Sequence, residues 1–125
     1  MDVTPLVPEG RQIIEAYGGG GFRVSGTVFG GSVLVMPELS QSWPVADIAA
    51  LSLESLEPVL AAAAGIEVLL IGCGKAMAFI DPDLREAAKA RGVALEPMDT
   101  GAACRTYNVL VAEDRQVAAA LIAVD

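Results

Sequence analysis

A short apolar segment followed by a well-marked helix constrains the fold of this chain more than any other feature. Glu67–Ile71 is apolar after its first residue, and we predict that it forms a buried strand. Asp81 and Pro82 then predict the start of a helix, with Asp81 as N-cap and Pro82 at the first helical position. Gly92 ends that helix, and Val93–Met98 is predicted to be another strand. This alternation with short connections indicates a layered α/β sheet.

The N-terminal third is predicted to contain short strands and a β-hairpin. The glycine run Gly18–Gly21 indicates a turn that requires positive φ angles, or else a mobile binding loop. Gly30-Gly31 indicates a second hairpin turn or a bulge. The strands are expected at Gln12–Tyr17, Phe22–Gly26, Thr27–Phe29 and Ser32–Met36.

The rest of the chain is predicted to add a loop, two helices and a closing strand. Glu38–Ser52 is expected to be a loop in which Trp43 anchors the core or its rim. One predicted helix is capped by Ser52 or Ser55, and the other begins at Asp99 or Thr100. A last strand follows the second of these helices. With about three helices, the 125 residues are expected to form one domain. The ranges are Ser55–Ala64 (the start that Pro58 favours), Gly101–Ala112 and Gln116–Val124.

Charge and hydropathy exclude several classes of partner. The net charge is −8, from 16 acidic and 8 basic residues, and the basic residues are scattered singly. Nucleic acid and anionic membrane surfaces are therefore poor partners. The apolar stretches Val59–Ile66 and Val68–Cys73 are separated by Glu67 and are too short to insert in a membrane. Without a recognisable signal peptide, we expect a cytoplasmic protein with reduced thiols instead of a Cys73–Cys104 disulfide.

The chain contains no histidine, which excludes more chemistry than any motif. A Ser-His-Asp triad, a Cys-His dyad and a His-ligated metal site all require that residue. Two distant cysteines are also too few for a structural zinc site. We expect no metal and no cofactor.

The turn Gly72-Cys73-Gly74-Lys75 is the first candidate binding site. It follows the buried strand, at the edge of the sheet where α/β proteins usually bind ligands. Its backbone N–H groups and the Lys75 ammonium would suit an anion. The third glycine of a dinucleotide motif is absent, however, and so is the Gly-Lys-Ser/Thr element of a P-loop. A tight structural turn is the simpler interpretation.

Cys104 is the second candidate, and it is predicted to lie in the first turn of the third helix if Asp99 or Thr100 is the cap. The helix N-terminus and Arg105 would favour its thiolate form, whereas Asp99 would oppose it. A buried, inert thiol is the alternative interpretation. Asp99 and Thr100 are interpreted first as helix caps. Asn108 lies in mid-helix, where asparagine is a mediocre helix former, so it is expected to bind a neighbouring loop or a ligand, with Arg105 beside it.

Four segments together resemble a known family. They are Gly20–Val24, Gly31–Val35, the Ile71–Gly74 turn, and the run Asp99-Thr100-Gly101-Ala102-Ala103-Cys104-Arg105-Thr106-Tyr107-Asn108-Val109-Leu110. In these segments and in their order, which together cover nearly the whole chain, the sequence resembles the family called domain of unknown function 498. One member of that family helps to assemble respiratory complex I in mitochondria. The resemblance implies a three-layer α/β domain with a central mixed sheet. It implies no catalytic residues, and Cys73 stands where a threonine or another polar residue is expected.

These observations favour a non-catalytic binding or assembly-factor module that acts through a protein partner, and a homodimer is a further expectation. The alternative is an anion-binding protein or small-molecule enzyme. It would use one pocket formed by Gly72, Gly74, Lys75, Cys104 and Arg105. A third hypothesis is a thiol redox sensor, which would require the two cysteines to lie within about 7 Å of each other.

Overall fold

The predicted buried strand lies inside a five-stranded mixed sheet. A computed structural model describes residues 10–62 and 65–125. In it the strand is β6 (Val68–Gly72), with β8 (Val117–Leu121) and β7 (Ala94–Met98) parallel to it on its two sides. The strands β4 (Val33–Val35) and β5 (Ser40–Ser42) continue the sheet in antiparallel pairing, so that its order is β5-β4-β8-β6-β7.

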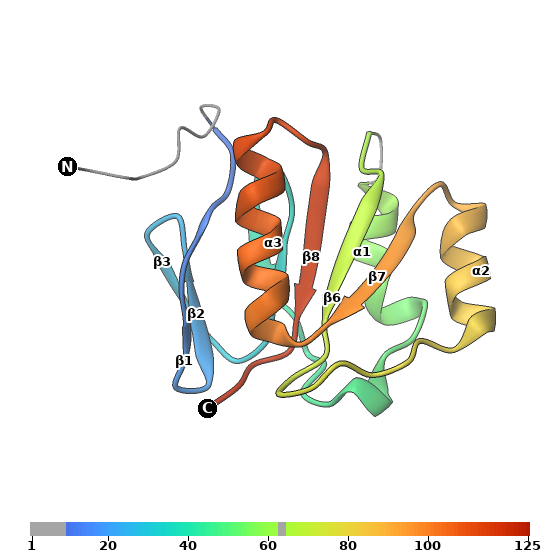
Figure 1. Cartoon of the computed structure of the whole chain (residues 1–125), viewed down its shortest axis with the longest axis horizontal. Helices are drawn as coiled ribbons and strands as arrows, with labels where there is room; N and C mark the ends of the chain where they lie inside the picture. The colour runs from blue at the N-terminus through green and yellow to red at the C-terminus, as the bar shows by residue number, and fades with distance from the viewer. Residues whose placement is uncertain (1–9, 63–64) are drawn as a thin grey trace.

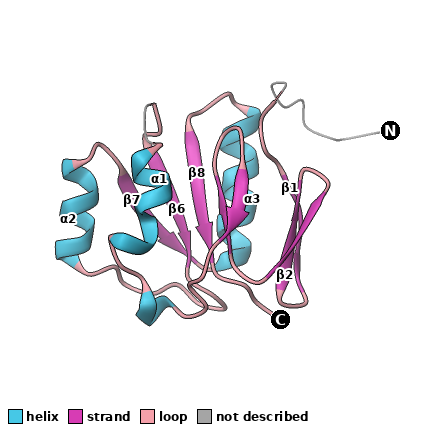
Figure 2. Cartoon of the chain, turned by 180° about the vertical axis from the view of Figure 1, so that it is seen from behind, coloured by secondary structure: helices cyan, strands magenta, loops and turns pink. Residues whose placement is uncertain are grey.

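Alternate residues of this sheet contribute to two separate cores. Leu69 and Ile71 of β6 pack with α1 (Glu57–Ala61) and α2 (Pro82–Ala90) on one face. On the other face, Leu70 packs under α3 (Thr100–Ala112). The two opposite views show α3 and α1 on opposite faces of the sheet (Figure 1 and Figure 2). Because both faces are covered, the central strands are apolar along their whole length. The fold is therefore a mixed, layered α/β fold, as predicted.

The N-terminal strands form a second, three-stranded antiparallel sheet beside α3 (Figure 1). These strands are β1 (Ile14–Gly18), β2 (Gly21–Val24) and β3 (Thr27–Gly30). Gly19 and Gly20 form the first two-residue turn, and Ser25 and Gly26 form the second. All four residues have positive φ, as type I′ hairpin turns require. The turn interpretation of Gly18–Gly21 is thus confirmed.

The predicted hairpin or bulge at Gly30-Gly31 is wrong. Strand β3 pairs with β2, whereas β4 pairs with β5 and β8, so these glycines lie where the chain leaves one sheet for the other. The strand β5 inside the predicted loop was also missed, because its residues Ser-Gln-Ser carry no apolar pattern. Its place in the sheet comes from pairing with β4.

The helix signals were more reliable. Asp81 accepts a hydrogen bond from the Asp83 backbone and caps α2, and Gly92 after its end has a φ of +85°. Trp43 is buried in the core, where its Nε1 donates to the Ser55 carbonyl oxygen at 2.8 Å. The first predicted helix is shorter than expected: a 3-10 turn at Glu54–Leu56 leads into α1, and the predicted end near residues 63–64 lies outside the described residues.

Candidate functional site

The start of α3 and the turn after β6 are joined by hydrogen bonds. The backbone N–H of Thr100 donates to the Gly74 carbonyl oxygen at 2.8 Å. The Oγ1 of Thr100 accepts from the Gly74 N–H at 3.0 Å and donates to the Ile122 carbonyl oxygen at 2.8 Å. Thr100 is fully buried, with an exposed fraction of 0%. Its hydroxyl therefore connects β6, α3 and the segment after β8.

A close approach explains the first glycine of this turn. A Cβ atom on Gly72 would lie 3.1 Å from both the Cα and the Oγ1 of Thr100. Because the Gly74 N–H already has a partner, it is not free to bind an anion. Lys75 extends into solvent and lies 3.8 Å from the Asp125 carboxylate. These contacts agree with the interpretation of Gly72–Lys75 as a tight structural turn, not as an anion-binding site.

Cys104 lies one turn further along α3 than predicted, and it is buried. Asp99 is the N-cap and accepts a hydrogen bond from the Ala102 N–H at 2.9 Å, so Cys104 belongs to the second turn. Only 2% of its surface is exposed. Burial is the main cause that raises the pKa of the Cys104 thiol, to about 12. The positive charge of Arg105 lowers this pKa by less than burial raises it, and the negative charge of Asp99 raises it further. The thiol is therefore protonated at neutral pH and has little nucleophilic character.

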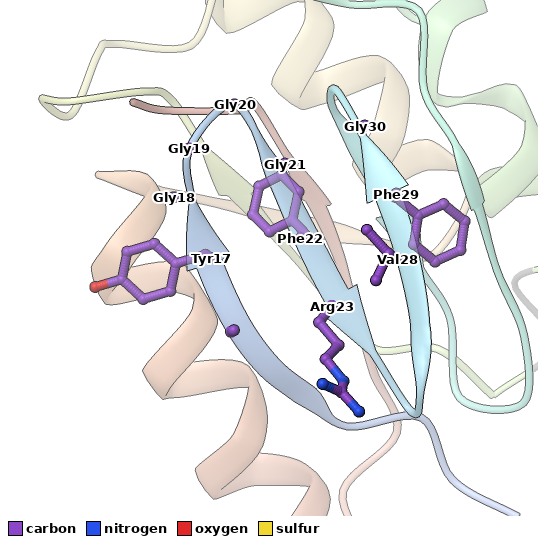
Figure 3. Close-up of a pocket in the computed structure, with 11 residues that line it drawn as sticks. Tyr17, Gly18, Gly19, Gly20, Gly21, Phe22, Arg23, Val28, Phe29 and Gly30 are labelled. Atoms are coloured by element: carbon purple, nitrogen blue, oxygen red, sulfur yellow. The ribbon is translucent and has the colours of Figure 1, made fainter.

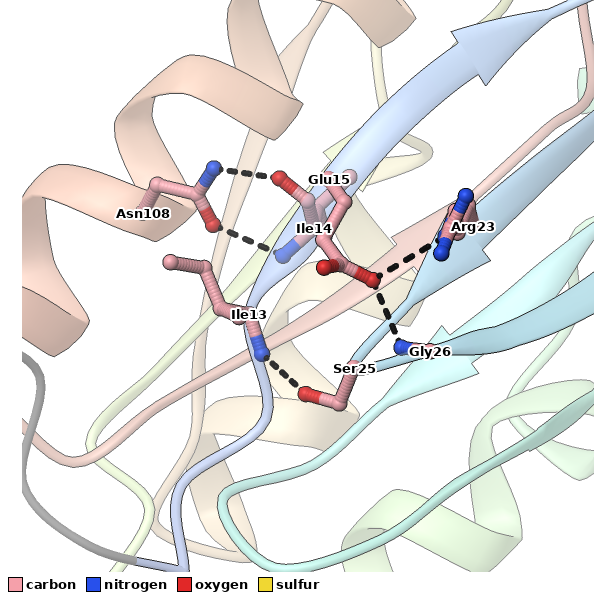
Figure 4. Close-up of polar contacts among 7 residues, drawn as sticks. All are labelled: Ile13, Ile14, Glu15, Arg23, Ser25, Gly26 and Asn108. Carbon is pink, nitrogen blue, oxygen red and sulfur yellow. Dashed lines mark hydrogen bonds and ion pairs between the residues drawn. The ribbon is translucent and has the colours of Figure 1, made fainter. Parts of the chain in front are cut away.

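Asn108 binds the protein's own backbone. Its Oδ1 accepts from the Ile14 N–H at 2.9 Å, and its Nδ2 donates to the Ile14 carbonyl oxygen at 2.7 Å (Figure 4). The amide thus pairs with β1 as a neighbouring strand would. The preceding residue of α3, Tyr107, donates from its hydroxyl to the Gln12 carbonyl oxygen at 3.0 Å. Asn108 was expected to bind a neighbouring loop or a ligand; both of its polar groups instead bind the first residue of a strand, β1.

The candidate residues do not come together in one pocket. Cys73 packs in the core under α1 and α2, whereas Cys104 packs in the core under α3, on the opposite face of the sheet. This separation removes the basis for a redox pair. Cys73 and Lys75 line a hollow of about 460 Å³ near the C-terminus, while Cys104 and Arg105 line a different hollow of about 350 Å³ beside β1. The Arg105 guanidinium donates to the Tyr17 hydroxyl at 3.1 Å.

A further hollow, of about 300 Å³, lies on the small sheet (Figure 3). Gly18, Gly21 and Gly30 are paired across its three strands, so the sheet has no side chains along this row. Two positions along the strands, the next cross-strand row on the same face carries Ala16, Arg23 and Val28. The sequence shows these glycines, but their alignment depends on strand register.

Two exposed apolar side chains were missed by the sequence analysis. Met77 and Phe79 lie in the connection between β6 and α2, with exposed fractions of 53% and 93%. Their neighbours Ala78 and Ile80 pack into the core instead. The sequence signal is weak because all four residues are apolar, so the alternation between core and solvent is invisible in the hydropathy pattern.

Neither a membrane span nor a metal cluster is found in the described parts of the chain. None of the helices within residues 10–62 and 65–125 has both the length and the apolar character to cross a membrane. The same residues contain no group of three or more cysteine, aspartate or glutamate side chains placed to hold a metal ion.

Comparison with known proteins identifies relatives over most of the chain. A family model described as "Protein of unknown function (DUF498/DUF598)" matches residues 14–122. "NADH dehydrogenase [ubiquinone] 1 alpha subcomplex assembly factor 3" of Xenopus tropicalis is 38% identical over 109 residues. That match covers 87% of this chain but only 60% of the relative.

Two bacterial proteins are similar over more of their own length. An uncharacterized protein of Rhodobacter capsulatus is 39% identical over 109 residues, which cover 87% of this chain and 82% of that protein. A crystal structure described as an outer membrane protein from Bartonella henselae is 39% identical, with a TM-score of 0.86. The structural match covers 96% of this chain and 100% of that one.

Proposed function

This chain belongs to the DUF498/DUF598 family of proteins of unknown function, and from that premise we propose that it is a non-catalytic, protein-binding module of the assembly-factor type. The relatives named as assembly factors are about 30–40% identical to it across the matched segment. The chain spans about 60% of the length of those relatives, so the proposal concerns the shared segment.

The proposal rests on one observation: the candidate polar side chains bind other parts of the same chain. The side chains of Thr100 and Asn108 form hydrogen bonds with backbone atoms, and the Asp99 side chain caps α3. The Cys104 thiol is buried with a raised pKa. A catalytic site needs polar or nucleophilic groups that are free to reach a substrate. These residues serve the structure instead, which favours a role in binding through the surface.

The anion-binding alternative has weaker support. It required Lys75 and Arg105 to face one ligand, but the two side chains line different hollows and contact different partners. The N–H group of Gly74 is already bonded to Thr100.

Capture of the full-length tagged chain from its own cells tests the proposal. After mild crosslinking, the bound proteins and small molecules are identified by mass spectrometry, and the complex is then rebuilt from purified components. We expect a stoichiometric complex between this chain and one subunit of a larger assembly. The bound subunit should be free, that is, not yet part of that assembly. Cells that lack this chain should accumulate that subunit outside the finished assembly.

A different pattern would contradict the proposal. If no protein binds and an anion co-purifies with the chain, but is lost in Lys75→Ala or Arg105→Ala, the protein is an anion binder. The variant Arg115→Ala is the matched control, because Arg115 is an exposed arginine that lines neither hollow.

A further inference from the structure

Among the described residues, the two sheets have four edge strands, and features of the chain itself protect three of them. At the edge of β1, the Asn108 amide binds both backbone polar groups of Ile14. In β7, Pro97 has no N–H to donate, and the Arg85 guanidinium donates to the Leu95 carbonyl oxygen at 2.8 Å. The strand β5 has only three residues, all of them polar. Such features keep an edge from pairing with another chain.

The fourth edge strand, β3, has none of these features. It contains no proline and no charged residue, and it lies at the outer border of the small sheet (Figure 1). The two-residue turn before β3 directs the backbone polar groups of Thr27 and Phe29 towards β2. Those of Val28 and Gly30 therefore point away from the sheet, and no hydrogen bond from another part of the described chain reaches them. Both residues are exposed, Val28 by 75%.

The outward groups of β3 match those of a second β3 in one antiparallel register. If Phe29 lies opposite Phe29 of a second copy, Val28 of each copy faces Gly30 of the other, and each such pair can exchange two hydrogen bonds. A register centred on Val28 would place Gly30 opposite the turn residue Gly26. One centred on Gly30 would place Val28 opposite Ser32, whose carbonyl oxygen already accepts a hydrogen bond. The register centred on Phe29 alone pairs every outward group within the two strands.

The side chains of β3 are also complementary in that register. Val28 and Gly30 lie on the outer face of the small sheet, beside the hollow of about 300 Å³ (Figure 3). A Cβ atom on Gly30 would meet nothing within 4 Å, so there is space beside this glycine for the second copy's Val28. On the inner face the two partly buried Phe29 rings become neighbours, and aromatic cross-strand pairs are favourable. The strand is uncharged, so the ladder sets no like charges against each other.

We propose that two copies of this chain pair through β3, as antiparallel strands around a two-fold axis, so that their small sheets join into one continuous sheet. The occupant of the edge is a second copy because the donors, the acceptors and the Val28 and Gly30 positions of β3 complement themselves. The contact is small, so the dimer is weak and reversible. The inference goes beyond the proposed function and is independent of it, since no step of it uses another protein.

Amide hydrogen exchange of the full-length chain, measured by NMR over a range of protein concentrations, tests the pairing. Sedimentation of the same samples gives the fraction of dimer. We expect exchange of the Val28 and Gly30 amides to slow as that fraction rises. The Thr27 and Phe29 amides should exchange slowly in every sample, because they bond to β2. A chain that stays monomeric up to about 1 mM, or protection that does not follow the dimer fraction, would overturn the inference.

Crosslinking between cysteines tests the register. In the proposed dimer, Phe29 is the one residue of β3 that lies opposite its own counterpart, at a Cα–Cα distance of about 4.5–5.5 Å that a disulfide can span. Thr27→Cys is the matched control, because the two copies of Thr27 would lie about 13 Å apart along the strands. We expect mild oxidation to give a covalent dimer of Phe29→Cys and not of Thr27→Cys. The native Cys73 and Cys104 are buried and should not react. Equal crosslinking of the two variants would contradict the register.

Val28→Pro tests the edge itself. Proline removes an outward N–H but leaves the hydrogen bonds between β2 and β3 intact, whereas the control Val28→Thr keeps both the N–H and the branched side chain. We expect Val28→Pro to raise the Kd of the dimer at least about tenfold and Val28→Thr to change it by less than about threefold. An unchanged Kd in a folded Val28→Pro variant would refute pairing through β3. If the proline variant does not fold, the crosslinking of Phe29→Cys against Thr27→Cys decides.

Discussion

Replacement of Thr100 by valine should destabilise the protein strongly, even though the two side chains have nearly the same shape. The valine cannot accept from the Gly74 N–H or donate to the Ile122 carbonyl oxygen, which Thr100 contacts at 3.0 and 2.8 Å. A buried polar group left without a partner costs about 1–3 kcal/mol. The Ile122 bond is buried and the Gly74 bond is partly buried, so we expect a loss of about 3 kcal/mol in the free energy of unfolding.

Urea unfolding, followed by circular dichroism, measures this loss. With a denaturant dependence of about 2 kcal/mol per molar urea, the unfolding midpoint of Thr100→Val should fall by about 1.5 M. Thr106→Val makes the same chemical change in the same helix, but the Thr106 side chain is only half-buried and forms no hydrogen bond within the described residues. That control should change the free energy by less than about 0.5 kcal/mol. Equal midpoints for the two variants would refute the structural role of the Thr100 hydroxyl.

Three further predictions test other contacts. Asn108→Ala should reduce the free energy of unfolding by about 1–3 kcal/mol and abolish hydrogen-exchange protection of the Ile14 amide, since both hydrogen bonds to Ile14 are lost. Gly21→Ala should cost about 1–3 kcal/mol, because a Cβ would meet a backbone carbonyl oxygen, whereas Gly30→Ala, with nothing within 4 Å, should cost under about 1 kcal/mol; equal melting temperatures would contradict this difference. The pKa of Cys104 is raised from 9.0 to about 12 on folding, so its contribution to stability is complete below pH 9 and is lost as the pH rises towards 12. Stability should therefore fall over that range by at most about 1.4 kcal/mol per pH unit from this group, and less steeply in Cys104→Ala, as measured by urea unfolding at each pH.

The boundaries of α2 and α3 and the central strand could be predicted from the sequence because their signals are local. Asp81 and Pro82 act on the first turn of α2 itself, and Asp99 caps α3 through a residue only three positions away. The apolar composition of β6 is likewise a property of five neighbouring residues. Such features need no knowledge of the rest of the fold.

Strand pairing and the roles of single polar residues were decided by the tertiary structure. Nothing near Gly30-Gly31 shows that the chain changes sheets there, because the partners of β4 are β5 and the distant strand β8. Likewise, Asn108 bonds to Ile14, which lies 94 residues away in the sequence. Burial, and not the adjacent Arg105, sets the pKa of Cys104. Local residues determined where α2 and α3 begin and end, but only packing between distant segments determined which polar groups remain free for function.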